Sequence, residues 1–319
     1  MKILVSLNIP KIAIDMLRAE GLEVTPWSDD LPMDKAQLMA AAQQHDILLS
    51  SSIYELDADF LEHNKHLKLI SQFAAGYNNI DMKKAAELGI PIANTPNAMT
   101  DATADIAFGL LLAVARKMFY LHKKIIANEW GHFRPQANLG IELKGKTVGI
   151  LGLGRIGSAF AKRCTGAYDM KVLYHNRNRN MDAENAFDAT YVSFEELLEK
   201  SDIISVHCAL TEDSKGMFNK AAFAKMKPAA IFLNTARGGI HNETDLIEAL
   251  QNHIIWGAGL DVTNPEPMHF DNPLLQMENV AVLPHIGSAT IEARNEMSRL
   301  AAVNIIEFTQ GKPLSNRVT

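Results

Sequence analysis

The chain has 319 residues, of which 47% are hydrophobic and 21% charged, with a formal net charge of −6. At roughly 150 residues per domain, this length predicts about two globular domains, each able to bury a core. The negative balance gives no electrostatic reason to expect nucleic acid or an anionic membrane as a partner.

Cysteine usage and apolar runs bear on the compartment. Cys164 and Cys208 are the only two cysteines and lack CxxC spacing, which fits a reducing compartment. The run from Ile106 to Ala115 is the longest apolar one, far short of the roughly 18–20 residues of a membrane span. Ser6 and Asn8 interrupt the N-terminal segment, which reads as a strand rather than a signal peptide. We therefore expect a cytoplasmic protein with no membrane partner.

In the N-terminal third of the chain, short apolar segments alternate with amphipathic ones. Residues 3–7, 46–50 and 68–73 are predicted as strands, with helices between them such as residues 11–20. Fully apolar strands separated by helices indicate a parallel sheet that is covered on both faces.

The segment from Thr100 to Lys124 is predicted as one long helix, with Thr100 or Asp101 as its N-cap. It is apolar around most of its circumference, so its apolar surface is larger than one face of a domain can bury. We therefore expect a two-fold homodimer with this helix at its centre.

A second series of strands and helices follows, and residues 288–310 are predicted as a final long helix. We expect one domain from residues 1–99 plus 287–319, with a second domain, residues 100–286, inserted into it. The fold class is α/β with two doubly wound parallel sheets. The strands of the second series are residues 146–152, 171–175, 202–207, 229–235, 255–262 and 280–285.

A glycine motif stands between the first strand of the second series and the helix after it. In the G-x-G-x-x-G pattern, the first glycine permits a tight turn, the second lets the backbone approach a pyrophosphate, and the third lets helix and strand pack closely. The helix N-terminus supplies amide donors to phosphates. The alternative is an ordinary turn between strand and helix. The motif consists of Gly152, Leu153, Gly154, Arg155, Ile156 and Gly157.

The end of the next strand bears on the choice of nicotinamide cofactor. An NAD enzyme places an Asp or Glu there to accept from the ribose 2′-hydroxyl. This chain has Asn176, Arg177 and Asn178 instead. No carboxylate repels a 2′-phosphate, and Arg177 can bind one, so NADPH is favoured over NADH. The alternative is that Arg177 is only a solvated loop arginine.

Three later segments follow predicted strand ends, where ligands bind in open α/β sheets. They carry Arg237, Glu266 and His285. Reduction of a 2-oxo acid requires a cation for the carboxylate, a proton donor for the developing alkoxide, and an anion that sustains the protonated donor. The spacing of the three residues alone does not prove that they converge. The histidines fit no metal-binding pattern, so no metal is expected.

Together, LGLGRIG, NTARGG, AGLDVTNPEP and LPHIGSAT resemble the signatures of the D-2-hydroxyacid dehydrogenases, as do FAAGYNNID and NTPNAMTDATADIAFGLLL. The DVTNPEP and PHIGSAT stretches are most similar to the glyoxylate/hydroxypyruvate reductase branch. The resemblance covers essentially the whole chain. It implies a Rossmann cofactor domain inserted into a flavodoxin-like substrate domain, and reduction of small 2-oxo acids.

The resemblance also implies residue roles. Arg237 becomes the substrate anchor, His285 the general acid/base and Glu266 its partner. Further substrate contacts are Ile53 and the backbone amides of Ala75 and Gly76. Residues that line the cofactor are then Thr103, Asp261, Thr235, Ala236, Arg237, His285 and Gly287.

Two departures from the family pattern affect the details. Ala209 stands where many relatives have proline. Phe133 stands, with Trp130, where the branch often carries two tryptophans, which puts substrate preference rather than the reaction in doubt. Two alternatives remain open. One is a 3-phosphoglycerate dehydrogenase-like enzyme, although the acidic residue and the additional domain of many such enzymes are missing. The other is a nucleotide-sensing, corepressor-like binding protein.

Overall fold

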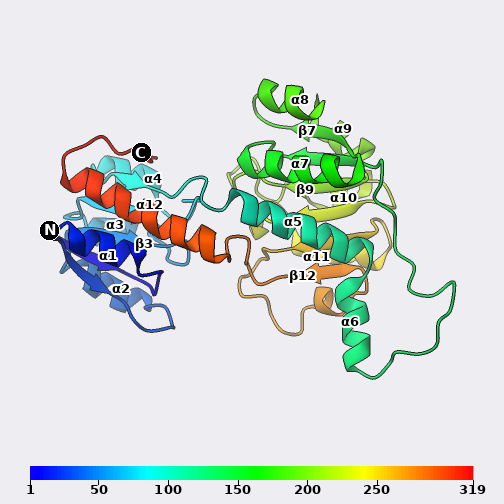
Figure 1. Ribbon diagram of the computed structural model, residues 1–319, viewed down its shortest axis with the longest axis horizontal. Helices are drawn as coiled ribbons and strands as arrows, with labels where there is room; N and C mark the ends of the chain where they lie inside the picture. The colour runs from blue at the N-terminus through cyan, green and yellow to red at the C-terminus, as the bar shows by residue number, and fades with distance from the viewer. Residues whose placement is uncertain (319) are drawn as a thin grey trace. The chain divides into compact units, whose positions relative to one another are not determined.

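A computed structural model describes residues 1–318, which form two compact units. The first unit joins Met1–Met99 to residues 289–318, and the second is Thr100–Ser288 (Figure 1). Thr319, which was expected in the first domain, lies outside the described residues. Gly287 and Ser288 fall in the second unit.

The first unit contains a parallel sheet of five strands in the order β2-β1-β3-β4-β5. Alternate residues face opposite sides of this sheet, as strand geometry requires. Leu4 and Leu48 pack toward the helices of one face, and Ile3 and Ile47 toward those of the other. The strands are β1 Lys2–Val5, β2 Glu23–Pro26, β3 Ile47–Ser50, β4 Leu69–Gln72 and β5 Ile92–Ala93.

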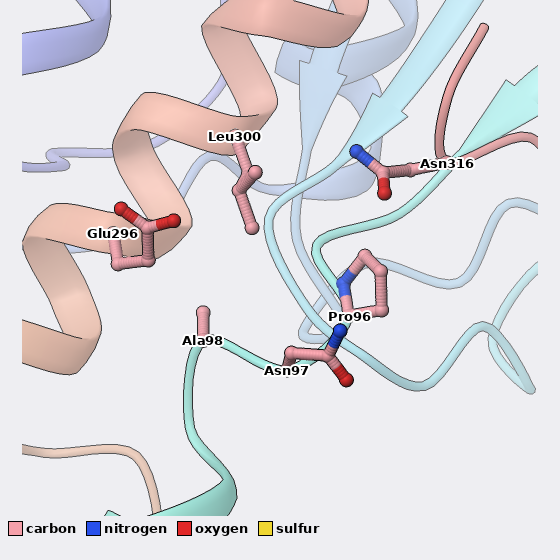
Figure 2. A pocket seen from close by; sticks show the side chains of 6 residues that line it. All are labelled: Pro96, Asn97, Ala98, Glu296, Leu300 and Asn316. Carbon is pink, nitrogen blue, oxygen red and sulfur yellow. The ribbon is translucent and has the colours of Figure 1, made fainter.

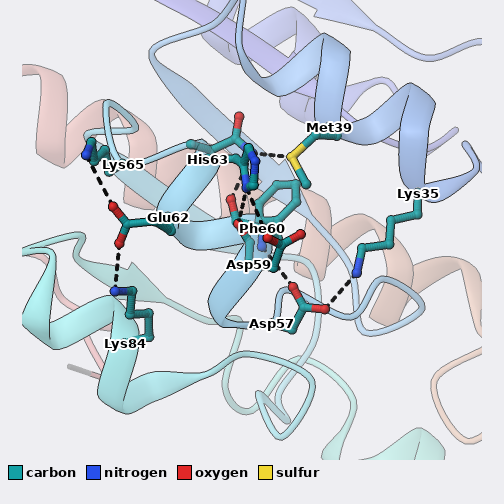
Figure 3. A network of polar contacts seen from close by, with 10 residues as sticks. Lys35, Met39, Asp57, Asp59, Phe60, Glu62, His63, Lys65 and Lys84 are labelled. Carbon is teal, nitrogen blue, oxygen red and sulfur yellow. Dashed lines mark hydrogen bonds and ion pairs between the residues drawn. The ribbon is translucent and has the colours of Figure 1, made fainter.

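Helices cover both faces of the first sheet. Two of them, α1 and α12, contact each other on one face, where the hydroxyl of Ser298 accepts from the Ala13 amide at 3.0 Å. The other three cover the opposite face. Exposed ion pairs join these three, such as Lys84 with Glu62 and Lys35 with Asp57, both at 2.7 Å (Figure 3); such pairs add little stability. The helices are α1 Ile12–Ala19, α2 Lys35–Ala42, α3 Ala58–His63, α4 Met82–Glu87 and α12 Ile291–Thr309.

The second unit contains a parallel sheet of seven strands in the order β12-β11-β10-β9-β6-β7-β8. The strand order reverses between β6 and β9, and ligands of doubly wound sheets bind at the carboxyl edge beside such a reversal. Both sheets confirm the α/β fold class. The strands are β6 Thr147–Leu151, β7 Lys171–His175, β8 Thr190–Tyr191, β9 Ile203–Val206, β10 Ile231–Asn234, β11 Gly257–Leu260 and β12 Val280–Val282.

One face of the second sheet packs against α5 and α7, and the other against α9, α10 and α11. The second unit therefore buries a core on each face of its sheet. Its helices are α5 Thr100–Ala115, α6 Met118–Ile126, α7 Arg155–Tyr168, α8 Met181–Phe187, α9 Phe194–Lys200, α10 Lys220–Lys225 and α11 Glu243–Gln251, with the short 3-10 helices η1 Gly238–Ile240 and η2 Pro273–Gln276.

The prediction of one helix from Thr100 to Lys124 is wrong, because α5 ends at Ala115 and α6 begins at Met118. The carbonyl of Ala115 accepts from the Ile141 amide at 2.9 Å rather than from an amide of the next helical turn. Lys117 has a left-handed backbone conformation with φ +54°. Thr100 and Asp101 already lie inside α5, so neither is its N-cap.

Most of the apolar surface of α5 is buried within its own unit, where it contacts α7 and strands β10 to β12 (Figure 1). Ile106, Phe108 and Leu112 of α5 are only partly buried, and the homodimer centred on this segment stays a prediction. Seven of the exposed large apolar side chains in the described residues lie in α6 and the segment after it: Met118, Phe119, Ile125, Ile126, Trp130, Phe133 and Leu139.

The final helix begins at Ile291 rather than Ser288, because the Thr290 hydroxyl accepts from the Ala293 amide and caps it. Three strands were not predicted. β2 is a partly exposed edge strand, and β5 and β8 have only two residues each. Among the helices within residues 1–318, none is long and apolar enough to cross a membrane.

Candidate active site

The strands of the second sheet are all parallel, so the loops that follow them emerge at one edge. The glycine motif follows β6, Asn176 and Arg177 follow β7, and Arg237 follows β10. Glu266 lies beyond β11, and His285 beyond β12. These predicted residues thus belong to one carboxyl edge.

We call residues 152–157 the glycine loop. Gly152 has φ +96°, and a Cβ atom there would lie 2.6 Å from the Cys208 amide nitrogen. Only glycine fits such a position. By contrast, a Cβ at Gly154 would meet no atom within 4 Å, so the backbone there is open to a ligand.

The amino end of α7 fits the pyrophosphate of a nicotinamide dinucleotide. Its N-cap, Gly154, has no side chain, so the first-turn amides, including those of Arg155 and Ile156, receive no side-chain cap. Such amides, together with the helix dipole, favour phosphate oxygens. The glycine loop and α7 thus provide a cradle into which the cofactor phosphates fit.

We call residues 176–180 the specificity loop. Asn176 does not project freely toward a ligand, because its Oδ1 accepts from the Leu153 amide at 2.7 Å. Arg177 and Asn178 are exposed, and no partner of Arg177 is found within residues 1–318. Arg179 is bound to Glu184 through two hydrogen bonds of 3.0 and 2.6 Å. The loop contains no carboxylate and leaves one guanidinium available.

His285 and Glu266 meet directly: Nδ1 of His285 lies 2.8 Å from Oε2 of Glu266. The other carboxylate oxygen, Oε1, accepts from the Thr263 amide at 2.9 Å, so both oxygens are engaged. Burial raises the pKa of Glu266, but the hydrogen bonds from His285 and Thr263 and the charge of Arg237 outweigh it and hold the pKa below its ordinary value. Glu266 is therefore an anion beside the imidazole.

Backbone geometry also marks His285, whose φ is +53°, a left-handed value rare for a residue with a side chain. The buried carboxylate of Asp261 accepts from the amides of Ile286 and Gly287 at 2.8 and 2.7 Å. The Thr103 hydroxyl donates to the Gly287 carbonyl at 2.9 Å. Asp261 and Thr103, expected as cofactor contacts, thus hold the loop of His285 in place.

The pKa of Asp261 lies above its ordinary value. Burial raises it, and the two amide hydrogen bonds oppose burial only in part. This carboxyl group is therefore less acidic than a solvated aspartate.

Arg237 lies at the end of a loop that Asn234 closes. The side chain of Asn234 accepts from the Ala236 amide at 3.0 Å and donates to the Arg237 carbonyl at 2.9 Å. Burial lowers the pKa of Arg237, and Glu266 opposes that shift. An arginine nevertheless stays protonated in proteins, so the site has a partly desolvated cation close to the carboxylate of Glu266.

The Arg237 loop packs tightly against the Glu266 loop. A Cβ atom on Gly238 would lie 1.8 Å from the carbonyl oxygen of Thr263. Beside it, Thr235 is buried, and its hydroxyl oxygen has no hydrogen-bond partner in the described part of the chain. The glycine permits the close approach of the two loops, and Thr235 keeps a hydroxyl for a ligand.

Ile53, Ala75 and Gly76 belong to the first unit, in the loops after β3 and β4. Ile53 is exposed. The side chain of Asn79 joins these two loops by donating to the carbonyls of Tyr54, at 2.7 Å, and Ser51, at 3.4 Å. The Ala75 carbonyl accepts from Asn94 at 2.7 Å. The loops are therefore held together within this unit.

A cavity of about 260 Å³ lies elsewhere in the first unit (Figure 2). Its lining includes Asn97, Glu296 and Asn316. Glu296 is already paired with Arg299 at 2.6 Å. None of the predicted site residues lines this cavity, so it offers no acid–base pair for the reaction.

Three positioning residues were missed from the sequence: Thr263, Asn234 and Asn180, whose Nδ2 donates to the Leu153 carbonyl at 2.7 Å. An asparagine at a strand end before a tight turn was a readable signal for Asn234, since its side chain can bond the backbone two residues on. The Thr263 amide gives no such signal, because its role depends on where the Glu266 side chain folds back.

Comparisons with known proteins agree with the family resemblance of the sequence. The family model described as D-isomer specific 2-hydroxyacid dehydrogenase, NAD binding domain, matches residues 108–287. A glyoxylate reductase of Thermococcus litoralis is 41% identical over 321 residues, covering 99% of this chain and 96% of that protein.

Solved structures extend the similarity. A glyoxylate reductase from Paecilomyes thermophila has a TM-score of 0.90 at 32% identity, covering 100% of this chain and 98% of that one. The NADPH-dependent glyoxylate/hydroxypyruvate reductase of Sinorhizobium meliloti, in complex with NADP and malonate, has a TM-score of 0.86 at 30% identity, covering 100% and 96%. Both units of this chain are included in these similarities.

Proposed function

Because this chain belongs to the D-isomer specific 2-hydroxyacid dehydrogenase family, we propose that it is an NADPH-preferring reductase of glyoxylate and hydroxypyruvate. Membership makes it a nicotinamide-dependent oxidoreductase. The names of its relatives support the substrate class, and the NADP in the Sinorhizobium meliloti enzyme supports the cofactor class.

The observation that carries this proposal is the pair of His285 and Glu266, 2.8 Å apart. An ionised carboxylate can only accept, so the proton between them sits on Nδ1 of His285. Nε2 is then the ring nitrogen that can transfer a proton to a substrate oxygen. The charge of Glu266 stabilises the doubly protonated ring that this transfer requires.

When bound, the nicotinamide supplies a hydride to the carbonyl carbon, which leaves negative charge on the carbonyl oxygen. His285 donates its Nε2 proton to that oxygen and acts as the general acid. Arg237 holds the carboxylate and polarises the carbonyl; partial burial strengthens both effects because the charge is poorly screened. On the family resemblance alone, the amides of Ala75 and Gly76 and the side chain of Ile53 are proposed as further contacts for a small 2-oxo acid.

NADPH preference is supported by the specificity loop. It has no acidic residue, and Arg177 is exposed without a partner among the described residues, while Arg179 is neutralised by Glu184. The 2′-phosphate of NADPH is an acceptor that suits a free guanidinium. NADH provides no group for Arg177 to bind and is less favoured.

We further propose a cytoplasmic homodimer. Its support is the exposed apolar surface of α6 and the segment after it, where Trp130 and Phe133 are 81% and 91% exposed. Large apolar side chains gathered on one exposed segment mark an interaction surface. A second copy of this chain would cover it.

The deciding experiment measures NADPH oxidation by the purified protein with glyoxylate, hydroxypyruvate, phosphohydroxypyruvate and phenylpyruvate. We expect the highest kcat/KM with the first two. Equal efficiency with phenylpyruvate would contradict the assignment to this branch, and preference for phosphohydroxypyruvate would favour the phosphoglycerate dehydrogenase alternative. A protein that binds NADPH but turns over none of them would favour the corepressor-like alternative.

A further inference from the structure

Both ends of the specificity loop are bonded to one residue of the glycine loop, Leu153. At the first end, Oδ1 of Asn176 accepts from the Leu153 amide at 2.7 Å. At the other end, Nδ2 of Asn180 donates to the Leu153 carbonyl, also at 2.7 Å. The two cofactor loops are therefore joined by both backbone groups of a single residue.

A second set of bonds anchors the specificity loop to the sheet beneath it. The buried phenol of Tyr174 accepts from the Asn180 amide at 2.9 Å and donates to Glu184 at 2.5 Å. The phenol of Tyr191 donates to the Asn176 carbonyl at 3.0 Å. The loop is thus fixed from below at each end by a tyrosine.

Asn180 has a further task, because its Oδ1 caps α8 by accepting from the Ala183 amide at 3.2 Å. One side chain therefore ties together the amino end of α8, the specificity loop and the glycine loop. This helix contacts α7, which begins at the glycine loop (Figure 1). Asn180 is thus one of the residues that link α8 to the phosphate cradle.

These bonds leave Arg177 and Asn178 exposed between two fixed ends. Arg179 is not a second free cation, because Glu184 binds it through both carboxylate oxygens, and the hydrogen bonds from Arg179 and Tyr174 hold the pKa of Glu184 below its ordinary value. We call the bonds of Asn176 and Asn180 to Leu153, together with those of Tyr174 and Tyr191 to the loop, the clamp. Within the described loop, Arg177 is the guanidinium available for a ligand, and the clamp holds the loop that carries it against the glycine loop.

We propose that Asn180 and Tyr174 are positioning residues for cofactor selectivity, which hold Arg177 so that the 2′-phosphate and the pyrophosphate are bound at the same time. This inference rests on the proposed binding of the 2′-phosphate by Arg177. A preorganised loop loses less freedom on binding than a mobile one. NADH has no 2′-phosphate, so loosening the clamp weakens NADPH binding more than NADH binding.

Asn180→Ser is the sharpest variant, since serine still caps a helix but is too short to reach Leu153. A second variant, Tyr174→Phe, removes the hydroxyl that accepts from the Asn180 amide. It keeps the ring, which packs edge-on against Tyr191. A matched control is Asn219→Ser, which makes the same change at the N-cap of α10, where no bond to the glycine loop exists among the described residues.

The dissociation constants of NADP⁺ and NAD⁺ are measured by titration calorimetry for each variant. Losing one hydrogen bond of the clamp is expected to weaken NADP⁺ binding roughly three- to tenfold, with less than about a twofold change for NAD⁺. The control should change neither. If Asn180→Ser unfolds the protein, Tyr174→Phe provides the same test by removing the bond between the Tyr174 hydroxyl and the Asn180 amide.

Combination with Arg177→Ala separates the clamp from a general effect on folding. If Asn180 acts through Arg177, Asn180→Ser should no longer change the ratio of the NADP⁺ and NAD⁺ dissociation constants once Arg177 is alanine. Equal weakening of both cofactors, or the same change of the ratio in the Arg177→Ala background, would overturn the clamp. If Arg177→Ala itself left the ratio unchanged, the proposed binding of the 2′-phosphate would fail first, and the two failures are thus distinguishable.

Discussion

The imidazole of His285 is bonded through Nδ1 to the carboxylate of Glu266 at 2.8 Å, and His285 itself has a left-handed backbone. The pair joins the loops after β11 and β12, which are neighbouring strands of the sheet. Because Nδ1 is bonded to Glu266, the proposed proton transfer would use Nε2 of His285, and this proposal leads to the first prediction.

Glu266→Gln keeps the shape of the side chain and removes its charge. Reduction consumes a proton, so kcat/KM in that direction should fall as pH rises, and hydroxyacid oxidation should rise over the same range. Because the variant removes the negative charge beside the proton donor, it should lower kcat/KM for reduction, with activity only partly lost.

The titration of Glu266 itself does not interfere with this test. Its pKa is held below the ordinary value of about 4.3, so the carboxylate stays ionised above that pH and gains a proton only in more acidic solution. His285→Ala is the companion variant; it should lower kcat by roughly 10²–10⁴-fold while NADP⁺ binding stays nearly unchanged. An unchanged kcat/KM for reduction in Glu266→Gln would show that the pair has no part in proton transfer.

Arg177→Ala should reduce kcat/KM with NADPH and spare NADH. Loss of one charge-assisted contact corresponds to roughly 1.5–3 kcal/mol, or about ten- to a hundredfold. Lys171→Ala is the control: it removes one positive charge from the amino end of the same strand, β7, and should change neither value. Equal losses with both cofactors would argue against binding of the 2′-phosphate.

Light scattering of the purified protein at micromolar concentration should give twice the mass of one chain. Ile126→Ser combined with Phe133→Ser should shift that mass toward the monomer, since both side chains are exposed and apolar. Phe270→Ser, an equally exposed position outside this segment, is the control and should leave the mass unchanged. A wild-type protein with the mass of one chain would refute the homodimer.

Gly238→Ala should separate the Arg237 loop from the Glu266 loop, because the new Cβ would lie 1.8 Å from the Thr263 carbonyl oxygen. Overpacking of this kind destabilises proteins by roughly 1–3 kcal/mol. We expect a lower unfolding free energy in denaturant titrations and a lower kcat/KM. Gly239→Ala is the control, since its Cβ would meet only the methyl groups of Leu210, at 3.2 and 3.4 Å. Equal effects of the two variants would contradict the argument.

Much of the fold could be predicted because local patterns report local structure. Apolar runs located β1, β3 and β4 and the main strands of the second sheet, and the glycine motif located the turn into α7. The break between α5 and α6 could not be predicted, because its cause is the Ile141 amide, which reaches the Ala115 carbonyl from a later part of the chain. The edge strand β2 was missed because it is too polar for its pattern to stand out.

The sequence by itself determined which chemical groups follow the strands: a glycine loop, a loop without acids after β7, and Arg237, Glu266 and His285 farther on. Motif spacing is a local property, so these could be read along the chain. Only the tertiary structure decided which groups meet. The strand order places β11 beside β12 and β6 beside β7, and so brings Glu266 to His285, and Asn176 and Asn180 to Leu153. Side-chain contacts across neighbouring strands depend on that order and on the loop conformations above it, and neither is written in the spacing of residues along the chain.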